Sequence, residues 1–278
     1  MGQLDFLVIG HVCKDLTNGG YRPGGTVVYS ALTARNLGRK VGVVTSAGPD
    51  LDPGEILEDI EVVCVSSPVT TTFRNLYEGG KRRQYLYQIA ERIGSADVPL
   101  AWRGAAIVQL SPVAGEIEGD MGDLFSSSLL CLTAQGWLRR RDEEGRVFPR
   151  QWVEAGELLQ GIDVLLLSEE DLAGEAGALR HHLGVPRMAV VTEGSKGATL
   201  HYGGEMLHFP GRSTTVVEPT GAGDVFAAAF LVRLEETSDP CQATRFANLA
   251  ASLSVERIGV ASIPDRTEIE ALMKTDSL

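Results

Sequence analysis

Short, largely apolar runs recur along the chain and predict buried strands. They lie at residues 6–10, 41–44, 105–110, 129–133, 162–167 and 188–191. Runs of this length, bounded by Gly, Pro and polar residues, are typical of strands covered on both faces, as in a parallel sheet. The pattern therefore predicts an α/β protein with a largely parallel central sheet. Ligands of such proteins gather beyond the carboxyl ends of the strands.

Other segments alternate between apolar and polar residues or carry helical patterns. Residues 70–77 and 83–89 are rich in β-branched and aromatic side chains, which predicts a β-hairpin across residues 78–81. The glycine-rich residues 19–25 are typical of a turn. Helical stretches are expected at 26–37, 119–126 and 243–252, and a buried helix is expected after Asp224.

The turn that opens this last helix, Pro219-Thr220-Gly221-Ala222-Gly223-Asp224, carries the clearest chemistry in the chain. Pro219 cannot continue a strand ladder, and the small residues after it lead directly into the helix. The unpaired N–H groups of Gly221 to Asp224 can converge on one anion, aided by the positive end of the helix dipole. The turn therefore predicts a site for phosphate.

Asp224 has two interpretations on spacing alone. As an acid in the first helical turn it could simply compensate the helix dipole. It could also be a general base, placed beside a transferring phosphoryl group because it takes a proton from the attacking hydroxyl. Other phosphate motifs fit less well, since the turn lacks the third glycine of the dinucleotide fingerprint and the chain has no Gly-x-x-x-x-Gly-Lys-Ser/Thr run.

Composition limits the classes of partner. With 278 residues, 44% hydrophobic and 22% charged, the chain is ordinary globular material for one large domain or two small ones. Its formal net charge of −12 argues against nucleic acid and anionic membranes as partners, because both are held mainly by Lys and Arg. The four cysteines show no metal-ligand spacing, and no leader or membrane span is recognised. We expect a cytoplasmic protein.

The Thr220–Asp224 run, followed by Phe226 and small residues, resembles the second signature of the ribokinase-like, or PfkB, carbohydrate kinases. The common form of that signature is Asp-Thr-x-Gly-Ala-Gly-Asp. Glu218 and Pro219 depart from its first two positions, and a Pro at the second is a variant associated with the myo-inositol kinase branch. The resemblance implies that Asp224 is the catalytic base and that the amides of Gly221, Ala222 and Gly223 form an anion hole.

The resemblance covers nearly the full chain and implies its architecture. Residues 1–278 are expected to form a single ribokinase-like domain, a three-layer α/β sandwich whose mostly parallel sheet carries helices on both faces. A small β lid, contributed by roughly 11–25 and 68–92, is expected to close over the substrate and exclude water. An edge of this lid could pair in a homodimer.

Substrate-side residues follow from the same resemblance. Asp15 corresponds to the acid that hydrogen-bonds substrate hydroxyls, and a Gly-Gly pair lets the substrate approach the backbone. Tyr29 stands where the family usually has Asn, which fits a divergent substrate class. The substrate-binding candidates are Asp15, Gly24, Gly25, Phe73, Asn75, Gln135, Gly136 and Arg139. For the lid residues, a plain edge hairpin is an equal alternative.

A second set of residues is expected to bind Mg·ATP. Thr192, Gly194, Lys196 and Gly197 resemble the Thr-x-Gly-x-x-Gly stretch beside the nucleotide phosphates, and Thr220, Asn248 and Ser252 complete the nucleotide candidates. Ser168 and Asp171 replace the family's Asn-x-x-Glu, which governs magnesium placement, and by spacing they also fit a capping box. Glu170 and Asp171 are the metal candidates, through water, and a monovalent cation could also bind.

The expected function is an ATP-dependent kinase that phosphorylates a hydroxyl of a small sugar or cyclic polyol, with a myo-inositol-like acceptor as the first expectation. A sugar or nucleoside kinase of the same family is the alternative. The departures at Tyr29, Ser168, Asp171 and Glu218 keep a further class open, a catalytically silent protein that binds a metabolite and regulates.

Overall fold

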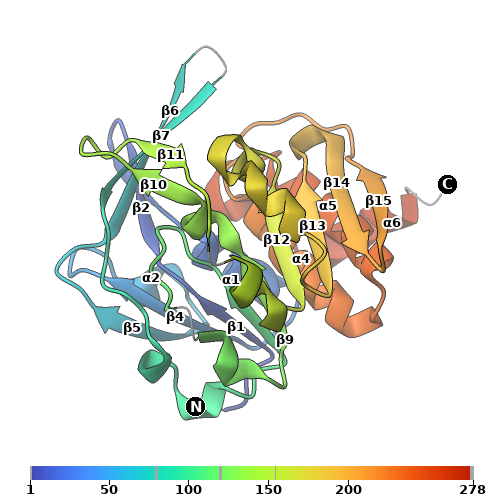
Figure 1. The fold of residues 1–278 in the computed structure, drawn as a ribbon, viewed down its shortest axis with the longest axis horizontal. Helices are drawn as coiled ribbons and strands as arrows, with labels where there is room; N and C mark the ends of the chain where they lie inside the picture. The colour runs from blue at the N-terminus through green and yellow to red at the C-terminus, as the bar shows by residue number, and fades with distance from the viewer. Residues whose placement is uncertain (1, 79–80, 119–120, 154, 276–278) are drawn as a thin grey trace.

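Nine strands form the largest sheet of the computed structural model, in the order β15-β14-β13-β12-β9-β8-β1-β4-β5 (Figure 1). The structure describes residues 2–78, 81–118, 121–153 and 155–275. Seven strands run parallel: β1 (Phe6–Ile9), β4 (Val41–Ala47), β5 (Glu61–Ser66), β8 (Ile107–Leu110), β9 (Leu129–Thr133), β12 (Val164–Ser168) and β13 (Met188–Thr192). A hairpin of β14 (Gly197–Tyr202) and β15 (Glu205–Pro210) adds two antiparallel strands at one edge.

Burial explains why the apolar runs form the centre of this sheet. Every residue of β1, β4 and β8 is buried, as continuous apolar runs require. All six predicted strands are present, and the largely parallel α/β architecture is confirmed. The sequence did not predict the edge strands β5 and β15 or β14, which lies next to β15, and all three keep partly exposed residues.

Helices of regular length cover one face of the sheet. They are α1 (Thr26–Asn36), α4 (Ala222–Thr237), α5 (Pro240–Ser254) and α6 (Arg266–Thr275). Alternate residues of the strands, such as Phe6 and Val8 of β1, pack with Val28, Phe226 and Phe246 of these helices. A four-residue helix, α2 (Pro53–Ile56), follows β4. No helix in the described ranges is long and apolar enough to span a bilayer.

The opposite face completes the predicted three-layer sandwich, but its cover is made of short segments. The intervening strand residues, such as Leu7 and Ile9, pack there with Trp102, Phe125 and Leu159. The segments include α3 (Ala155–Leu158) and 3-10 turns at Met121–Phe125, Glu170–Leu172 and Gly174–His182. The helix expected over 119–126 is one of these 3-10 turns, and its first two residues lie outside the described ranges. Frequent glycine here disfavours longer α-helices, since each costs about 1 kcal/mol relative to Ala.

A four-stranded sheet, hereafter the small sheet, has the order β3-β2-β6-β7. It consists of β2 (Cys13–Thr17), β3 (Gly20–Gly24), β6 (Thr71–Glu78) and β7 (Lys81–Gln88), so the predicted hairpin is confirmed. Residues 20–24, which the glycine pattern assigned to a turn, form a strand instead, because their backbone pairs with β2. The ribbon of β10 (Arg139–Arg141) and β11 (Val147–Pro149) lies beside β7 (Figure 1).

A buried polar junction joins the small sheet to the large one. Glu116, 2% exposed, accepts hydrogen bonds from the backbone N–H groups of His11 (2.9 Å), Val113 (3.0 Å) and Ala114 (2.7 Å). His11 Nε2 lies 2.8 Å from the Glu91 carbonyl, which can only accept, so Nε2 carries the proton. Nδ1 then accepts from the Thr71 hydroxyl at 2.7 Å.

This junction predicts a stability effect for Glu116→Gln. The amide places an NH₂ group among backbone donors, so at least one buried N–H loses its acceptor. We expect the free energy of unfolding to fall by about 1–3 kcal/mol in urea denaturation. Glu118→Gln is the matched control, because Glu118 is exposed, and it should change the value by less than about 0.5 kcal/mol. Equal losses in the two variants would contradict the role given to the junction.

Candidate functional site

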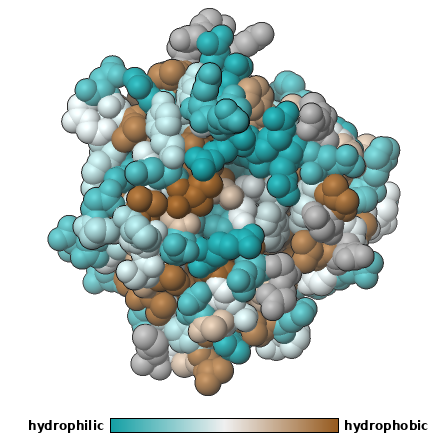
Figure 2. Space-filling model, turned by 60° about the vertical axis from the view of Figure 1, so that its left-hand side comes forward, coloured by the Kyte–Doolittle hydropathy of each residue, from teal (hydrophilic) through white to brown (hydrophobic). Residues whose placement is uncertain are grey.

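A cavity of about 840 Å³ lies where the carboxyl ends of β12 and β13, the start of α4 and the small sheet meet. Its walls include Asp15 and Asn75 from the small sheet, Thr192 from the end of β13 and Asp224 from the first turn of α4. Figure 2 shows one face of the molecule, where apolar residues near the centre are bordered by hydrophilic ones. The cavity is the position at which ligands gather in parallel α/β proteins.

The N-terminal turn of α4 forms one wall of the cavity. Gly221 is the helix N-cap, with φ 84°, a left-handed conformation that favours glycine. Two amides of the predicted anion hole already donate within the turn, Ala222 to Pro219 O at 3.3 Å and Asp224 to Gly221 O at 3.0 Å. Within the described ranges, no acceptor is found for the amides of Gly221 and Gly223. These two amides are therefore the better placed to bind an anion.

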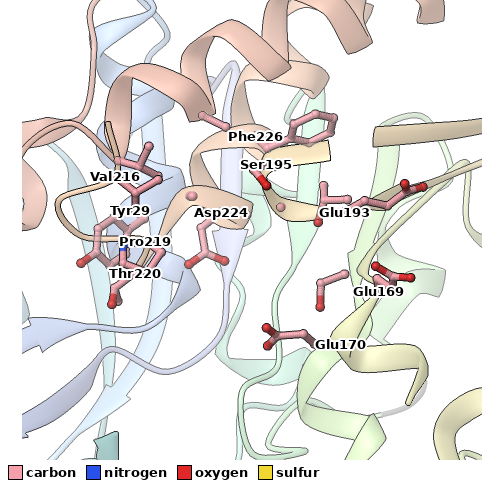
Figure 3. A pocket seen from close by; sticks show the side chains of 18 of the residues that line it. Tyr29, Glu169, Glu170, Glu193, Ser195, Val216, Pro219, Thr220, Asp224 and Phe226 are labelled. Atoms are coloured by element: carbon pink, nitrogen blue, oxygen red, sulfur yellow. The ribbon is translucent and has the colours of Figure 1, made fainter. Parts of the chain in front are cut away.

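Asp224 extends from this turn into the cavity (Figure 3). Tyr29 and Thr220 lie on one side of its carboxylate, and Glu169, Glu170 and Glu193 lie across the cavity. The Asp224 backbone carbonyl accepts from Ser30 Oγ at 3.3 Å, which ties the turn to α1. A carboxylate that faces a cavity from the positive end of a helix can serve as a proton acceptor there.

Tyr29, which stands where the ribokinase-like kinases usually have Asn, packs directly on the turn. A Cβ built on Gly221 would lie 2.3 Å from Tyr29 Cδ1, so the ring occupies the space that any larger residue would need. Tyr29 is 5% exposed. Burial raises the pKa of its phenol well above the usual value of 10.0, and the charges of Asp224 and Asp15 raise that pKa further. The hydroxyl therefore stays protonated at neutral pH.

Most predicted substrate-side residues line the part of the cavity beside the small sheet, which we call the acceptor end after that prediction. They are Asp15, Gly25, Phe73, Asn75, Gln135 and Arg139. Gly24 and Gly136 lie behind this wall and permit close packing. A Cβ on Gly24 would lie 2.1 Å from Asp15 Oδ2, and a Cβ on Gly136 would lie 2.6 Å from the Pro112 carbonyl carbon.

Most of the predicted nucleotide residues line the remainder of the cavity, which we call the donor end after that prediction. Thr192, Gly194, Gly197, Thr220, Asn248 and Ser252 line the cavity there. Lys196 is directed elsewhere, since its side chain is 68% exposed and lies 3.4 Å from Glu169 Oε2. Asn248 Nδ2 donates to the Phe209 carbonyl at 3.1 Å, so this amide also has a structural role.

Several wall residues have no sequence signal. Arg212, Thr214 and Val216 come from the irregular segment between β15 and α4, where no motif marks them. Arg212 pairs with Glu256 at 2.9 Å, and Thr214 donates to the same carboxylate. Gln84 of β7 also lines the acceptor end. Its part in the hairpin was predicted, but the direction of its side chain depends on the register with β6.

The two metal candidates differ in their surroundings. Glu170 is exposed and lines the cavity, whereas Asp171 does not and is largely buried. Ser168 and Asp171 form the predicted capping box, with the Ser168 amide donating to Asp171 Oδ2 at 3.1 Å and the Asp171 amide donating to Ser168 Oγ at 3.1 Å. The described residues include no group of three potential metal ligands. One carboxylate such as Glu170 still fits Mg²⁺ that is bound mainly by phosphates and water.

Comparisons with known proteins identify a phosphotransferase with an alcohol group as acceptor. Residues 138–267 match the model of the pfkB family carbohydrate kinases. A cytidine kinase of Thermococcus kodakarensis is 27% identical over 247 residues, 82% of this chain and 88% of its own. Residues 138–267 therefore carry a PfkB family carbohydrate kinase domain, and the chain is similar over most of its length to sugar and nucleoside kinases.

Solved structures agree with this assignment. A pyrophosphate-dependent kinase in the ribokinase family, complexed with a pyrophosphate analog and myo-inositol, is 27% identical with a TM-score of 0.80. The match covers 96% of this chain and 99% of that one. Ribokinase of Arabidopsis thaliana, complexed with ribose and ATP, is 24% identical with a TM-score of 0.75 and covers 99% of both chains. The latter likeness shows the fold, which confirms the ribokinase-like architecture.

The raised pKa of Tyr29 predicts how stability depends on pH. A phenol whose pKa is higher in the folded chain stabilises the fold below the unfolded pKa of about 10, and this contribution is lost as the pH rises above it. We expect the free energy of unfolding to fall more steeply above pH 10 in the wild type than in Tyr29→Phe. Tyr202→Phe, at an exposed position, should follow the wild type. Identical pH profiles for all three proteins would refute the shift.

Proposed function

We propose that this protein transfers the γ-phosphoryl group of ATP to a hydroxyl of a small cyclic polyol, with a myo-inositol-like compound as the first candidate acceptor. The observation that carries the proposal is the position of Asp224, whose carboxylate extends into the cavity from the start of α4. The solved relative that holds myo-inositol supports the acceptor class. A sugar or a nucleoside is the alternative acceptor, and the cytidine kinase relative favours the nucleoside.

In this proposal Asp224 accepts the proton of the attacking hydroxyl. Its carboxylate lies at the start of α4, so the positive helix end stabilises the charged base before transfer. The amides of Gly221 and Gly223 then bind the negative charge of the transferring group. Tyr29 remains a neutral phenol beside this turn, so it adds no negative charge that would oppose the phosphates.

The acceptor end orients the substrate through groups that recognise hydroxyls. Asp15 lies on β2, and its carboxylate can accept hydrogen bonds from substrate hydroxyls. Phe73 and Val113 supply apolar contact for the faces of a ring. The small sheet would act as the lid and exclude water from the transfer, which limits hydrolysis of the donor.

The donor end fits ATP because it combines polar and apolar walls. Val216, Ala251 and Val255 offer an apolar surface for a base, and Thr192 and Ser195 add hydroxyl groups to the cavity wall. Glu170 would hold Mg²⁺ through water, and the metal would neutralise charge on the phosphates. Pyrophosphate is the second candidate donor, since the relative bound to myo-inositol uses it.

Asp224→Asn tests the base. We expect kcat to fall by about 10² to 10⁴, the usual worth of general-base catalysis, with smaller changes in both KM values. The measurement is ADP release with Mg·ATP over myo-inositol, ribose, fructose and cytidine, with phosphate release from pyrophosphate as the parallel donor assay.

Asp123→Asn is the matched control, because it removes an exposed acid from a different segment and should leave kcat unchanged. Undiminished kcat in Asp224→Asn would reduce Asp224 to a helix-dipole acid. A wild type that releases no product, yet is thermally stabilised by an acceptor, would instead indicate the catalytically silent binding protein.

Gly24→Ala tests the part played by Asp15. The added methyl would overlap Asp15 Oδ2, so the carboxylate must move away from its present position. We expect the KM for the acceptor to rise about tenfold or more while the KM for ATP stays near its wild-type value. Gly19→Ala is the control from the same hairpin, where an added Cβ meets open space. Equal KM values in the two variants would exclude Asp15 from acceptor binding.

A further inference from the structure

A continuous chain of polar side chains crosses the acceptor end, from the end of β12 to the small sheet. Ser168 Oγ donates to Asp171 Oδ2 at 2.7 Å, and Arg139 Nη2 donates to Asp171 Oδ1 at 3.3 Å. Arg139 Nη1 donates to Gln84 Oε1 at 2.9 Å, and Gln84 Nε2 donates to Asn75 Oδ1 at 3.1 Å. We call these five side chains the polar relay. All except Asp171 line the cavity.

The chemistry of Arg139 fixes the direction of the relay. A guanidinium group only donates, so the Gln84 atom that faces it must be the amide oxygen. The Gln84 nitrogen then faces Asn75, whose facing atom must in turn be its oxygen. The side-chain amides of Gln84 and Asn75 are thereby each held in one of two possible orientations, with the NH₂ group directed away from Arg139.

Asp171 anchors the relay from outside the cavity. Its side chain is 7% exposed and that of Arg139 is 17% exposed, so their ion pair is largely shielded from water. Charge-assisted hydrogen bonds of this kind are about twice as strong as neutral ones. Without the Asp171 charge, the largely buried guanidinium of Arg139 loses its carboxylate partner, and its hydrogen bond to Gln84 is expected to weaken.

The same contacts remove Asp171 from metal binding. Oδ1 accepts from Arg139, and Oδ2 accepts from both the amide and the hydroxyl of Ser168. A cation at this carboxylate would also meet the positive charge of Arg139. Glu170, the neighbouring acid, is exposed on the cavity wall and has the freer approach.

We propose that Asp171, acting through Arg139, is a positioning residue for the acceptor substrate, and that Gln84 is a specificity-determining residue of the acceptor end. The relay fixes the orientation of two amide groups on β6 and β7, and the carboxylates of Asp15, on the neighbouring strand β2, and of Asp224, at the start of α4, line the same cavity. A polyol hydroxyl matches both kinds of group, because its hydrogen binds a carboxylate and its oxygen accepts from an amide. This inference rests on the proposed function.

Two variants test the relay. Gln84→Glu keeps an oxygen for Arg139 but cannot donate to Asn75, and Asp171→Asn removes the charge that anchors Arg139. For each we expect the KM for the acceptor to rise on the order of tenfold, the effect of losing one hydrogen bond. The KM for ATP and the Mg²⁺ concentration that gives half-maximal rate should stay within about twofold of the wild type.

Gln88→Glu is the matched control, since Gln88 lies on the same strand, is exposed and is not part of the cavity wall. It should leave all three constants unchanged. An Asp171→Asn variant with a shifted Mg²⁺ requirement and an unchanged acceptor KM would overturn the proposal and return Asp171 to the metal. If Asp171→Asn does not fold, Gln84→Glu decides alone, and an unchanged acceptor KM in it overturns the proposal.

Hydrogen exchange separates the relay from the proposed function. If the wild type phosphorylates no acceptor, the proposed function has failed, but the relay still joins β7 to the end of β12 in the large sheet. The amides of β7 should then exchange faster in Asp171→Asn than in the wild type, and Gln88→Glu should match the wild type. Equal exchange in all three proteins would overturn the relay.

Discussion

The contact between the Tyr29 ring and the backbone of Gly221 constrains the whole site. Gly221, the N-cap of α4, has a left-handed conformation that only glycine adopts easily. The Tyr29 ring occupies the space that a side chain at position 221 would need. The helix behind it is buried among α1 and α5, so the turn has a rigid support. Asp224 and the amides of Gly221 and Gly223 are thereby fixed relative to the cavity before any ligand binds, which lowers the cost of organising them during transfer.

The fold could be predicted where burial leaves a strong pattern. The runs at β1, β4 and β8 are buried on both faces, and they read as strands because nearly every residue is apolar. The edge strands β5 and β15 were missed, since their exposed positions dilute that pattern. The second face was predicted as helical without its detail, because only tertiary packing decides how glycine-rich segments form 3-10 turns.

The site could be predicted where function is local in sequence. The turn at Gly221 and the Thr192–Gly197 stretch carry their chemistry within a few residues, and both line one cavity. Long-range partners could not be predicted from spacing. Asp171 was expected near a metal, yet its carboxylate binds Arg139, and nothing in the sequence marked Gln84 as a residue of the site. Glu116 shows the same limit, since its acceptor role depends on His11, which lies far away in sequence.

Direct transfer between two ligands in one cavity determines the stereochemical course at phosphorus. In the proposed mechanism a single in-line attack by the acceptor hydroxyl, assisted by Asp224, inverts the configuration of the transferred group. The measurement uses ATP made chiral at the γ-phosphorus with oxygen isotopes, followed by analysis of the phosphorylated acceptor. Inversion is the predicted result. Retention would indicate two successive displacements through a phosphorylated side chain, and it would contradict the assignment of Asp224 as a base acting on the acceptor.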